Sequence, residues 1–270
     1  MMTKKNSRFR TLHEAPGCFV IPNPWDVGSA RLLAGLGFQA LATSSAAAAC
    51  AIGHRDGGIT REQALAHARA IVDATDLPVS ADLENGFGDA PGTVAETVRL
   101  AAEAGLAGCT IEDSTRNPEH PLYDFELAVE RIAAAVEAAR SLPDGFLLTA
   151  RAHNLLHGGT LDEALRRLVA YEKAGADVLF APGLADLDAV RTVCQTVSKP
   201  VNFMAGIPGK SFPLADLAAA GVKRISLATA LYRAAMTGLL DAVREVQGAG
   251  TFGFVDQVVP TGHLYKVMGI

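Results

Sequence analysis

Eight short apolar segments alternate with eight longer amphipathic segments along this chain, and no other feature limits the fold as strongly. The short segments cover residues 18–21, 40–43, 79–82, 108–111, 146–150, 178–180, 201–204 and 224–227. Apolar residues at helical spacing lie in residues 27–36, 60–74, 93–104, 124–141, 160–174, 185–197, 213–220 and 230–247. Eight successive strand–helix units predict a parallel (β/α)₈ barrel, also called a TIM barrel.

An open, doubly wound sheet is the alternative fold for such an alternation. That fold binds a nucleotide at a glycine-rich turn after its first strand. Residues 22–27, which follow the first predicted strand, contain no glycine. The barrel is therefore favoured. No linker or change of composition divides the chain, so we expect one domain over 1–270, with the barrel core at 18–247 and a C-terminal tail at 248–270.

Composition and charge exclude several classes of protein. The 270 residues are 49% hydrophobic, which is enough for a large core. Their net charge of −5 argues against nonspecific nucleic-acid binding, which needs dense positive charge. No run of about 18 apolar residues is present, so we expect no membrane partner. The four cysteines have no paired spacing, which is typical of free thiols in a reducing compartment. We expect a cytoplasmic protein.

Carboxylates follow the third and fourth predicted strands. Asp82 and Glu84 end the third strand, and Glu112 ends the fourth. The carboxyl ends of the strands form the active-site face of a barrel, so these side chains should meet there. An all-oxygen cluster suits Mg²⁺, or Mn²⁺, better than Zn²⁺. The alternative is that these residues are only helix caps and surface ion pairs.

Other polar residues are predicted to reach the same face. Arg151 can hold a substrate carboxylate with two parallel hydrogen bonds, and His153 follows it closely. Ser44 and Ser45 open a loop of small residues whose backbone N–H groups can hold an oxyanion. Trp25 follows the first predicted strand, and Asn202 belongs to the seventh. Schiff-base chemistry is not expected, because the sixth strand ends without a lysine.

Taken in order, these segments resemble the isocitrate lyase/phosphoenolpyruvate mutase family. The resemblance covers about residues 19–246 and rests on the segments Thr43-Ser44-Ser45, Gly53-His54-Arg55-Asp56, Asp82-Leu83-Glu84-Asn85-Gly86-Phe87-Gly88, Ile111-Glu112-Asp113, Ala150-Arg151, Val201-Asn202-Phe203-Met204 and Arg224-Ile225-Ser226-Leu227-Ala228. Each segment alone is common. Their combination in this order is specific.

The resemblance implies a magnesium enzyme that acts on a small 2-oxo or 2-hydroxy acid through a pyruvate-type enolate. It implies Mg²⁺ bound by Asp82, and by Glu84 and Glu112 directly or through water. The implied substrate-binding residues are Trp25, Ser44, Ser45, Ala46, Arg151 and Asn202, and the implied catalytic group is Arg151, Glu112, Asp56 and His153. The family is also usually tetrameric and exchanges its last helix between subunits. A homo-oligomer, dimer or tetramer, is therefore expected, with the apolar tail 252–259 available for the exchange.

The chain departs from the family pattern in one functional loop. Lyases of the family carry a loop of the Lys-Cys-Gly-His type after the Ile-Glu-Asp motif, whereas residues 114–121 here are short and contain no cysteine. We therefore predict a lyase that cleaves a carbon–carbon bond without a thiol, as an oxaloacetate decarboxylase does. The alternatives are a P–C bond enzyme of the phosphoenolpyruvate mutase or phosphonopyruvate hydrolase type and a non-catalytic protein that binds a 2-oxo acid such as 2-oxoglutarate.

Overall fold

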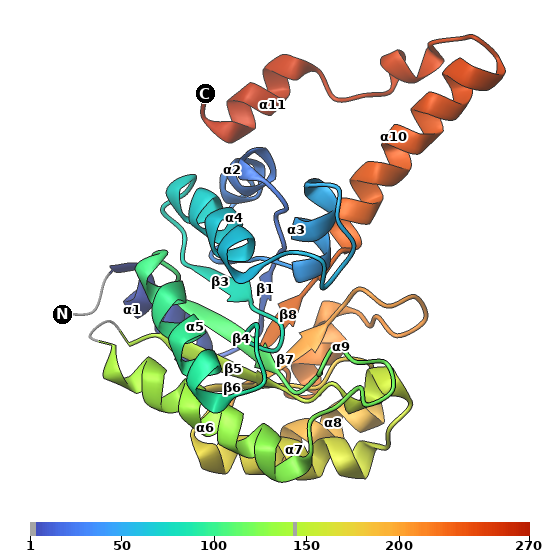
Figure 1. The fold of residues 1–270 in the computed structure, drawn as a ribbon. Helices are drawn as coiled ribbons and strands as arrows, with labels where there is room; N and C mark the ends of the chain where they lie inside the picture. Colours follow the sequence, from blue (N-terminus) through green and yellow to red (C-terminus); the bar gives the residue numbers. More distant parts are fainter. Residues whose placement is uncertain (1–3, 143–144) are drawn as a thin grey trace.

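The computed structural model describes residues 4–142 and 145–270 and contains, within them, one sheet of eight parallel strands (Figure 1). The strands pair in the order β1-β8-β7-β6-β5-β4-β3-β2. Their bounds are β1 (Phe19–Ile21), β2 (Leu41–Ala42), β3 (Val79–Asp82), β4 (Gly108–Glu112), β5 (Leu147–Arg151), β6 (Val178–Phe180), β7 (Val201–Met204) and β8 (Arg224–Ser226).

The sheet curls until its first and second strands meet. Although β1 and β2 share no ladder, the Ala42 amide donates to the Pro22 carbonyl oxygen at 3.0 Å, and Asn23 Nδ2 donates to the Thr43 carbonyl oxygen at 3.0 Å. The predicted (β/α)₈ barrel is thereby confirmed, and the open doubly wound sheet is excluded. All strands are parallel, so their carboxyl ends share one face of the barrel.

All eight predicted helices are present, each within two residues of its expected bounds. They are α2 (Val27–Gly35), α4 (Arg61–Asp73), α5 (Pro91–Glu103), α6 (Phe125–Ser141), α7 (Leu161–Ala174), α8 (Leu187–Thr196), α9 (Leu214–Ala219) and α10 (Ala230–Gly248). Their apolar faces cover the strands; on α6, for example, Ile132 and Val136 are buried in the core. No helix in the described part of the chain is long and apolar enough to cross a membrane.

The structure adds helices that the periodicity did not predict. They are α1 (Lys4–Glu14), α3 (Ser45–Ala51), α11 (Thr261–Met268) and the short 3₁₀ turns η1 (Asn154–His157) and η2 (Gly253–Asp256). Helix α1 is polar and basic, so its sequence shows little amphipathic pattern. It covers the amino-terminal end of the barrel, because Phe9 is completely buried there against Ile21 and Leu147.

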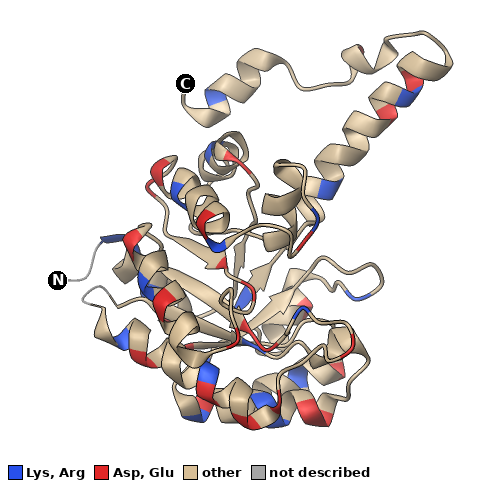
Figure 2. Ribbon diagram, in the orientation of Figure 1, with Lys and Arg blue, Asp and Glu red and all other residues tan. Residues whose placement is uncertain are grey.

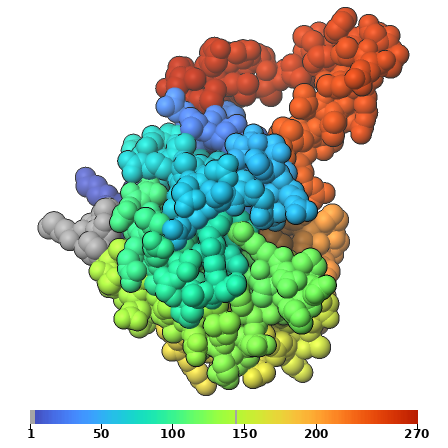
Figure 3. Space-filling view, in the orientation of Figure 1, coloured from blue at the N-terminus to red at the C-terminus, as the bar shows by residue number. Residues whose placement is uncertain are grey.

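Residues 230–270 form a C-terminal arm that leaves the barrel (Figures 1 and 3). None of the residues of α10 is buried, and residues 234–240 carry no charge, in contrast to the charged outer helices of the barrel (Figure 2). The arm returns so that α11 packs on α2. Gly35 permits this approach, since a Cβ atom there would lie 1.8 Å from the Val267 carbonyl oxygen.

Candidate active site

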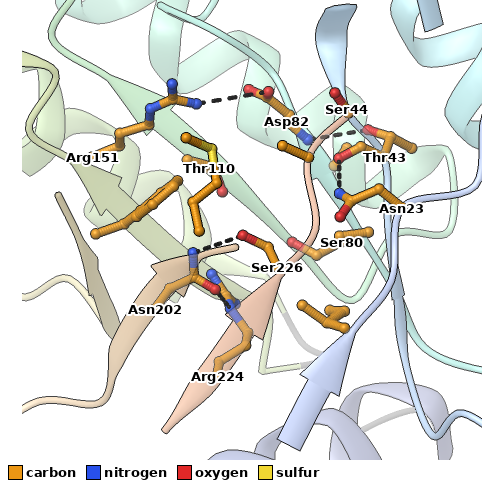
Figure 4. Close-up of a pocket in the computed structure, with 16 residues that line it drawn as sticks. Asn23, Thr43, Ser44, Ser80, Asp82, Thr110, Arg151, Asn202, Arg224 and Ser226 are labelled. Carbon is orange, nitrogen blue, oxygen red and sulfur yellow. Dashed lines mark hydrogen bonds and ion pairs between the residues drawn. The ribbon is translucent and has the colours of Figure 1, made fainter. Parts of the chain in front are cut away.

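A cavity opens at the carboxyl ends of the strands (Figure 4). Four of the predicted site residues line it directly, namely Ser44, Asp82, Arg151 and Asn202. Half of the remaining lining residues are polar and also come from strands or their ends: Asn23, Thr43, Ser80, Thr110, Arg224 and Ser226. A barrel interior is normally filled by bulky branched side chains. The small polar side chains here leave space instead, and they require polar partners inside it.

Asp82 is fixed in this cavity by donors on both of its oxygens. Its Oδ2 accepts from the Ser45 amide at 3.3 Å and from Ser45 Oγ at 3.1 Å, while its Oδ1 accepts from the Glu84 amide at 3.2 Å. Arg151 Nη1 lies 3.8 Å from the same Oδ2 (Figure 4). Burial raises the pKa of Asp82; Arg151 opposes the rise and Glu112 adds to it. The carboxylate is therefore held in place at an electrostatic cost.

Glu112 lies between two nitrogen donors. Its Oε2 is 3.3 Å from Arg151 Nε and 3.1 Å from His153 Nδ1. Burial alone would raise the pKa of Glu112, but Arg151 and His153 together lower it to about 2. Arg151 Nε nevertheless has no partner with hydrogen-bond geometry among the described residues. Arg151 Nε is therefore held against Glu112 by charge, without a directed hydrogen bond.

Glu84 carries the opposite electrostatic signature. Burial raises its pKa to about 8, although Arg116 Nη2 lies only 2.6 Å from its Oε2. Both residues adopt left-handed backbone angles, with φ of 51° for Glu84 and 65° for Arg116. Such angles cost energy for residues other than glycine and concentrate at functional sites. Arg116 was not among the expected site residues, because nothing in a short polar loop distinguishes one cation from its neighbours.

Four carboxylates therefore act on one another at this rim. Asp56 lies in an exposed loop, yet its charge reaches both Asp82 and Glu84. With Glu112 included, the four carboxylates face the guanidinium groups of Arg116 and Arg151, which leaves two negative charges in surplus when all are ionised. A divalent cation would balance that surplus, and the oxygen donors are those that Mg²⁺ and Mn²⁺ prefer.

The placement of these carboxylates also limits the metal interpretation. Within residues 4–142 and 145–270, no three His, Cys, Asp or Glu side chains converge closely enough to hold a metal ion as they stand. Glu84 and Glu112 instead each contact an arginine. The donor chemistry fits Mg²⁺, but these arginine contacts would have to loosen when an ion binds.

Ser44 and Ser45 begin helix α3, not the loop expected from the small residues that follow. Ser44 Oγ accepts from the Ala47 amide at 3.5 Å as the N-cap of the helix. A serine followed by an alanine run is a helix start, since alanine has the highest helix propensity. The expected loop is wrong, but Ser45 still donates to Asp82.

Three predicted substrate-binding residues do not line the cavity: Ser45, which contacts Asp82 instead, Trp25 and Ala46. Trp25 packs edge-on against Tyr232 of α10, with ring centroids 5.6 Å apart. Ala46 lies in the first turn of α3 and is also absent from the cavity lining. His153 reaches the site through Arg151 and Glu112, with its Nε2 3.5 Å from Arg151 Nη2. A lone aromatic or alanine after a strand gives no signal of the direction in which its side chain points.

Other polar residues near the strand ends have structural partners. Asp113 accepts from Tyr171 Oη at 2.6 Å, from Arg167 Nη1 at 3.1 Å and from the His153 amide at 2.7 Å. The loop that follows closes on itself through a bridge between Ser114 and Leu122. Asp113 therefore holds the backbone of His153 and does not reach into the cavity.

A (β/α)₈ barrel with an acidic rim and a buried guanidinium at its carboxyl face defines an enzyme of small anionic substrates. The family described as phosphoenolpyruvate phosphomutase matches residues 9–247. The chain belongs to this isocitrate lyase/phosphoenolpyruvate mutase superfamily and is a lyase-type enzyme of it.

Individual relatives agree with this placement. A Burkholderia cenocepacia protein described as a lyase/mutase has a crystal structure 53% identical to this chain, with a TM-score of 0.97 over 99% of this chain and 97% of its own. The 2,3-dimethylmalate lyase of Eubacterium barkeri is 30% identical over 98% of this chain and 94% of its own. The oxaloacetate decarboxylase of Paraburkholderia xenovorans is 30% identical over 91% of this chain and 83% of its own.

Proposed function

We propose that this protein is a magnesium-dependent lyase that cleaves a carbon–carbon bond in a small 2-oxo or 2-hydroxy dicarboxylate through a pyruvate-type enolate. One observation carries the proposal. Arg151 lines the cavity together with Asp82 and Asn202, and its Nη1 lies 3.8 Å from Asp82 Oδ2, too far for a hydrogen bond. A planar guanidinium with a free donor is suited to a carboxylate. The similarity to a dimethylmalate lyase and an oxaloacetate decarboxylase supports the same substrate class.

The residues of this chain divide the work of binding. Arg151 on β5 and Asn202 on β7 both line the cavity, and the Arg151 guanidinium and the Asn202 Nδ2 would hold the substrate carboxylate (Figure 4). Asp82, with Glu84 and Glu112, would hold the metal ion, which when bound would stabilise negative charge on the oxo oxygen of the substrate. Asp56 at the rim adds charge to this acidic group.

The reaction that fits these groups best is decarboxylation of an oxaloacetate-type acid. The bond between C3 and the departing carboxylate breaks, its electron pair enters the enolate, and CO₂ leaves. Arg151 stabilises the negative charge of the enolate. A proton from water then completes pyruvate, so the step needs no thiol. This agrees with loop 114–121, which contains no cysteine.

A panel of 2-oxo, 2-hydroxy and phosphono acids tests the reaction. We expect the protein with Mg²⁺ to release pyruvate from at least one dicarboxylate of the panel well above the rate with Mg²⁺ alone, and EDTA to remove that excess. Phosphate release from phosphonopyruvate would favour the P–C alternative. Tight binding of a 2-oxo acid by calorimetry, with rates equal to the metal blank across the panel, would support the non-catalytic alternative and contradict the proposal.

We also propose that the C-terminal arm joins a second copy of this chain. The arm exposes large apolar side chains that a monomer would leave in water, including Leu239, Leu240, Val243, Phe252 and Val255. Contiguous apolar surface of this kind marks interfaces. Light scattering at micromolar concentration should give a dimer or tetramer. A monomer under the same conditions would contradict the proposal.

A further inference from the structure

A line of polar side chains runs below the cavity, from β7 to the helix that covers the bottom of the barrel. It contains Asn202 on β7, Arg224 on β8, Thr149 on β5 and His13 on α1. Arg224 lies beneath Asn202 and Ser226 in the cavity (Figure 4). Apolar side chains normally fill the interior of a barrel, so a set of polar groups there is unusual. Their hydrogen bonds therefore require a separate explanation.

Arg224 is a buried cation with only neutral partners. The residue is only 4% exposed, and among the described residues no carboxylate forms an ion pair with it. Its Nε donates to Asn202 Oδ1 at 2.8 Å, and its Nη2 donates to Thr149 Oγ1 at 3.0 Å. Burial lowers the pKa of Arg224 to about 9, so it stays positive at neutral pH. A charge buried without a counter-ion is costly to the fold.

His13 fixes the guanidinium from the side opposite to the cavity. Its Nδ1 lies 2.8 Å from the Phe9 carbonyl oxygen, which can only accept, so Nδ1 carries the proton. Its Nε2 is then an acceptor for Arg224 Nη1 at 3.3 Å. Burial, with Arg224 adding to the effect, lowers the pKa of His13 to about 3 and keeps the ring neutral. Helix α1 thus supplies an acceptor that orients Arg224.

The orientation of the Asn202 amide follows from this arrangement. A guanidinium N–H only donates, so the atom of Asn202 that meets Arg224 Nε must be the amide oxygen. The amide nitrogen is consequently turned away from Arg224, toward Ser226 Oγ at 3.0 Å. Its two hydrogens serve one bond to Ser226 and leave one for a ligand in the cavity. With the opposite amide orientation, an oxygen would face the ligand and repel a carboxylate.

We propose that Arg224 is a positioning residue of the substrate-carboxylate subsite: it locks the Asn202 amide with Nδ2 toward the cavity, and its unpaired charge favours an anion there. The proposal rests on the proposed function in one respect, the assignment of Asn202 to the substrate carboxylate. The proposal adds to the substrate site a residue that lies beneath Asn202, and it explains why the barrel interior is polar there. It also connects helix α1 to ligand binding.

The charge of Arg224 provides a test that packing alone cannot imitate. In Arg224→Met, an unbranched neutral side chain replaces the guanidinium. We expect the affinity for oxalate, a planar dianion that resembles the enolate of pyruvate, to fall about ten-fold or more in the presence of Mg²⁺, as for loss of a charge-assisted interaction. The affinity for Mg²⁺ alone should stay equal or increase, because a buried positive charge repels the ion. Calorimetry measures both affinities.

Matched variants separate charge from packing. Thr149→Val removes one neutral partner of Arg224 while keeping the charge and the bond to Asn202. We expect its oxalate affinity to stay within about two-fold of the wild type. Arg224→Lys keeps the charge and one donor, so it should fold even where the methionine variant does not, with a smaller loss of oxalate affinity.

Several results would overturn the proposal. If Arg224→Met binds oxalate as tightly as the wild type, Arg224 does not have this role. If only Arg224→Lys folds, the same conclusion follows when that variant binds oxalate like the wild type while Asn202→Ala binds it more weakly. If Arg224→Met loses oxalate and Mg²⁺ affinity equally, or if Thr149→Val loses as much oxalate affinity as Arg224→Met, the role of Arg224 is packing alone. Failure of the wild type to bind oxalate would also refute the proposal. Turnover is not part of this experiment, so failure of the lyase proposal appears separately, as absence of product from the substrate panel.

Discussion

Replacing Asp82 by asparagine should abolish magnesium-dependent ligand binding and lower turnover by about 10²- to 10³-fold, the cost of removing one preorganised electrostatic group. Asp82 is the carboxylate on which the cavity is organised, since it accepts from Ser45 and the Glu84 amide and faces Arg151. Asparagine has nearly the same shape and no charge. The attraction for a cation is therefore lost while the packing is kept.

Thermal unfolding distinguishes this loss from misfolding. Burial raises the pKa of Asp82, so its ionised form lowers the stability of the folded protein above that pKa. Without Mg²⁺ at neutral pH, Asp82→Asn should melt near the wild-type temperature, because relief of the buried charge offsets the one acceptor oxygen that the amide no longer offers to Ser45 or Glu84. Saturating Mg²⁺ should raise the Tm of the wild type and leave that of the variant unchanged.

A matched control uses a carboxylate outside the site. Asp73 is exposed on α4 and pairs with Arg69. Asp73→Asn should therefore keep the full magnesium-dependent rise in Tm. A rise of wild-type size in Asp82→Asn would show that Asp82 does not bind the ion, and the metal proposal would lose its central residue.

Replacing Arg151 by lysine should weaken oxalate binding in the presence of Mg²⁺ by about 10- to 100-fold, or roughly 1.4–2.8 kcal/mol. Lysine keeps the positive charge but loses the planar fork that holds a carboxylate in two places. Arg151 also stacks over Phe180, with its guanidinium carbon 5.0 Å from the ring centroid, and this contact orients the fork. Titration calorimetry gives the affinity directly.

Arg166 offers a close control for this variant. It stacks on Phe125 at 3.8 Å and pairs with Glu163, as Arg151 stacks on Phe180 and pairs with Glu112, but it lies at the surface on α7. Arg166→Lys should leave oxalate affinity unchanged. If Arg151→Lys binds oxalate as the wild type does, the planar fork has no part in carboxylate recognition.

The barrel itself could be predicted because its signal is local and repeated. Each strand is a short apolar run and each helix has a 3.6-residue period, as in α6, so eight independent segments agree on one architecture. Helix α1 lacked that signal, since it buries few side chains, among them Phe9 and His13, and is otherwise polar. Helix α3 was missed because an alanine run shows no apolar periodicity, although its high helix propensity and the Ser44 N-cap favour a helix.

The site was predictable only in part, for a similar reason. Asp82 and Arg151 end β3 and β5, Ser44 lies two residues beyond β2, and parallel strands bring such positions to one face, where Asn202 of β7 joins them in the cavity. Arg224 stands at the beginning of β8, where position alone suggests no role. Arg116 contacts Glu84 from a loop in which its own backbone takes a left-handed angle, and the sequence does not indicate such an angle for arginine.

The sequence by itself determined the parallel barrel, the face that carries the chemistry and the acidic and cationic residues available there. These follow from periodicity and strand polarity, which act between near neighbours along the chain. Only the tertiary structure decided which carboxylate each arginine faces, that Trp25 packs on Tyr232, and that His13 supports Arg224 from 211 positions away. Such pairings depend on side-chain directions and on burial after the barrel closes, so no local pattern encodes them.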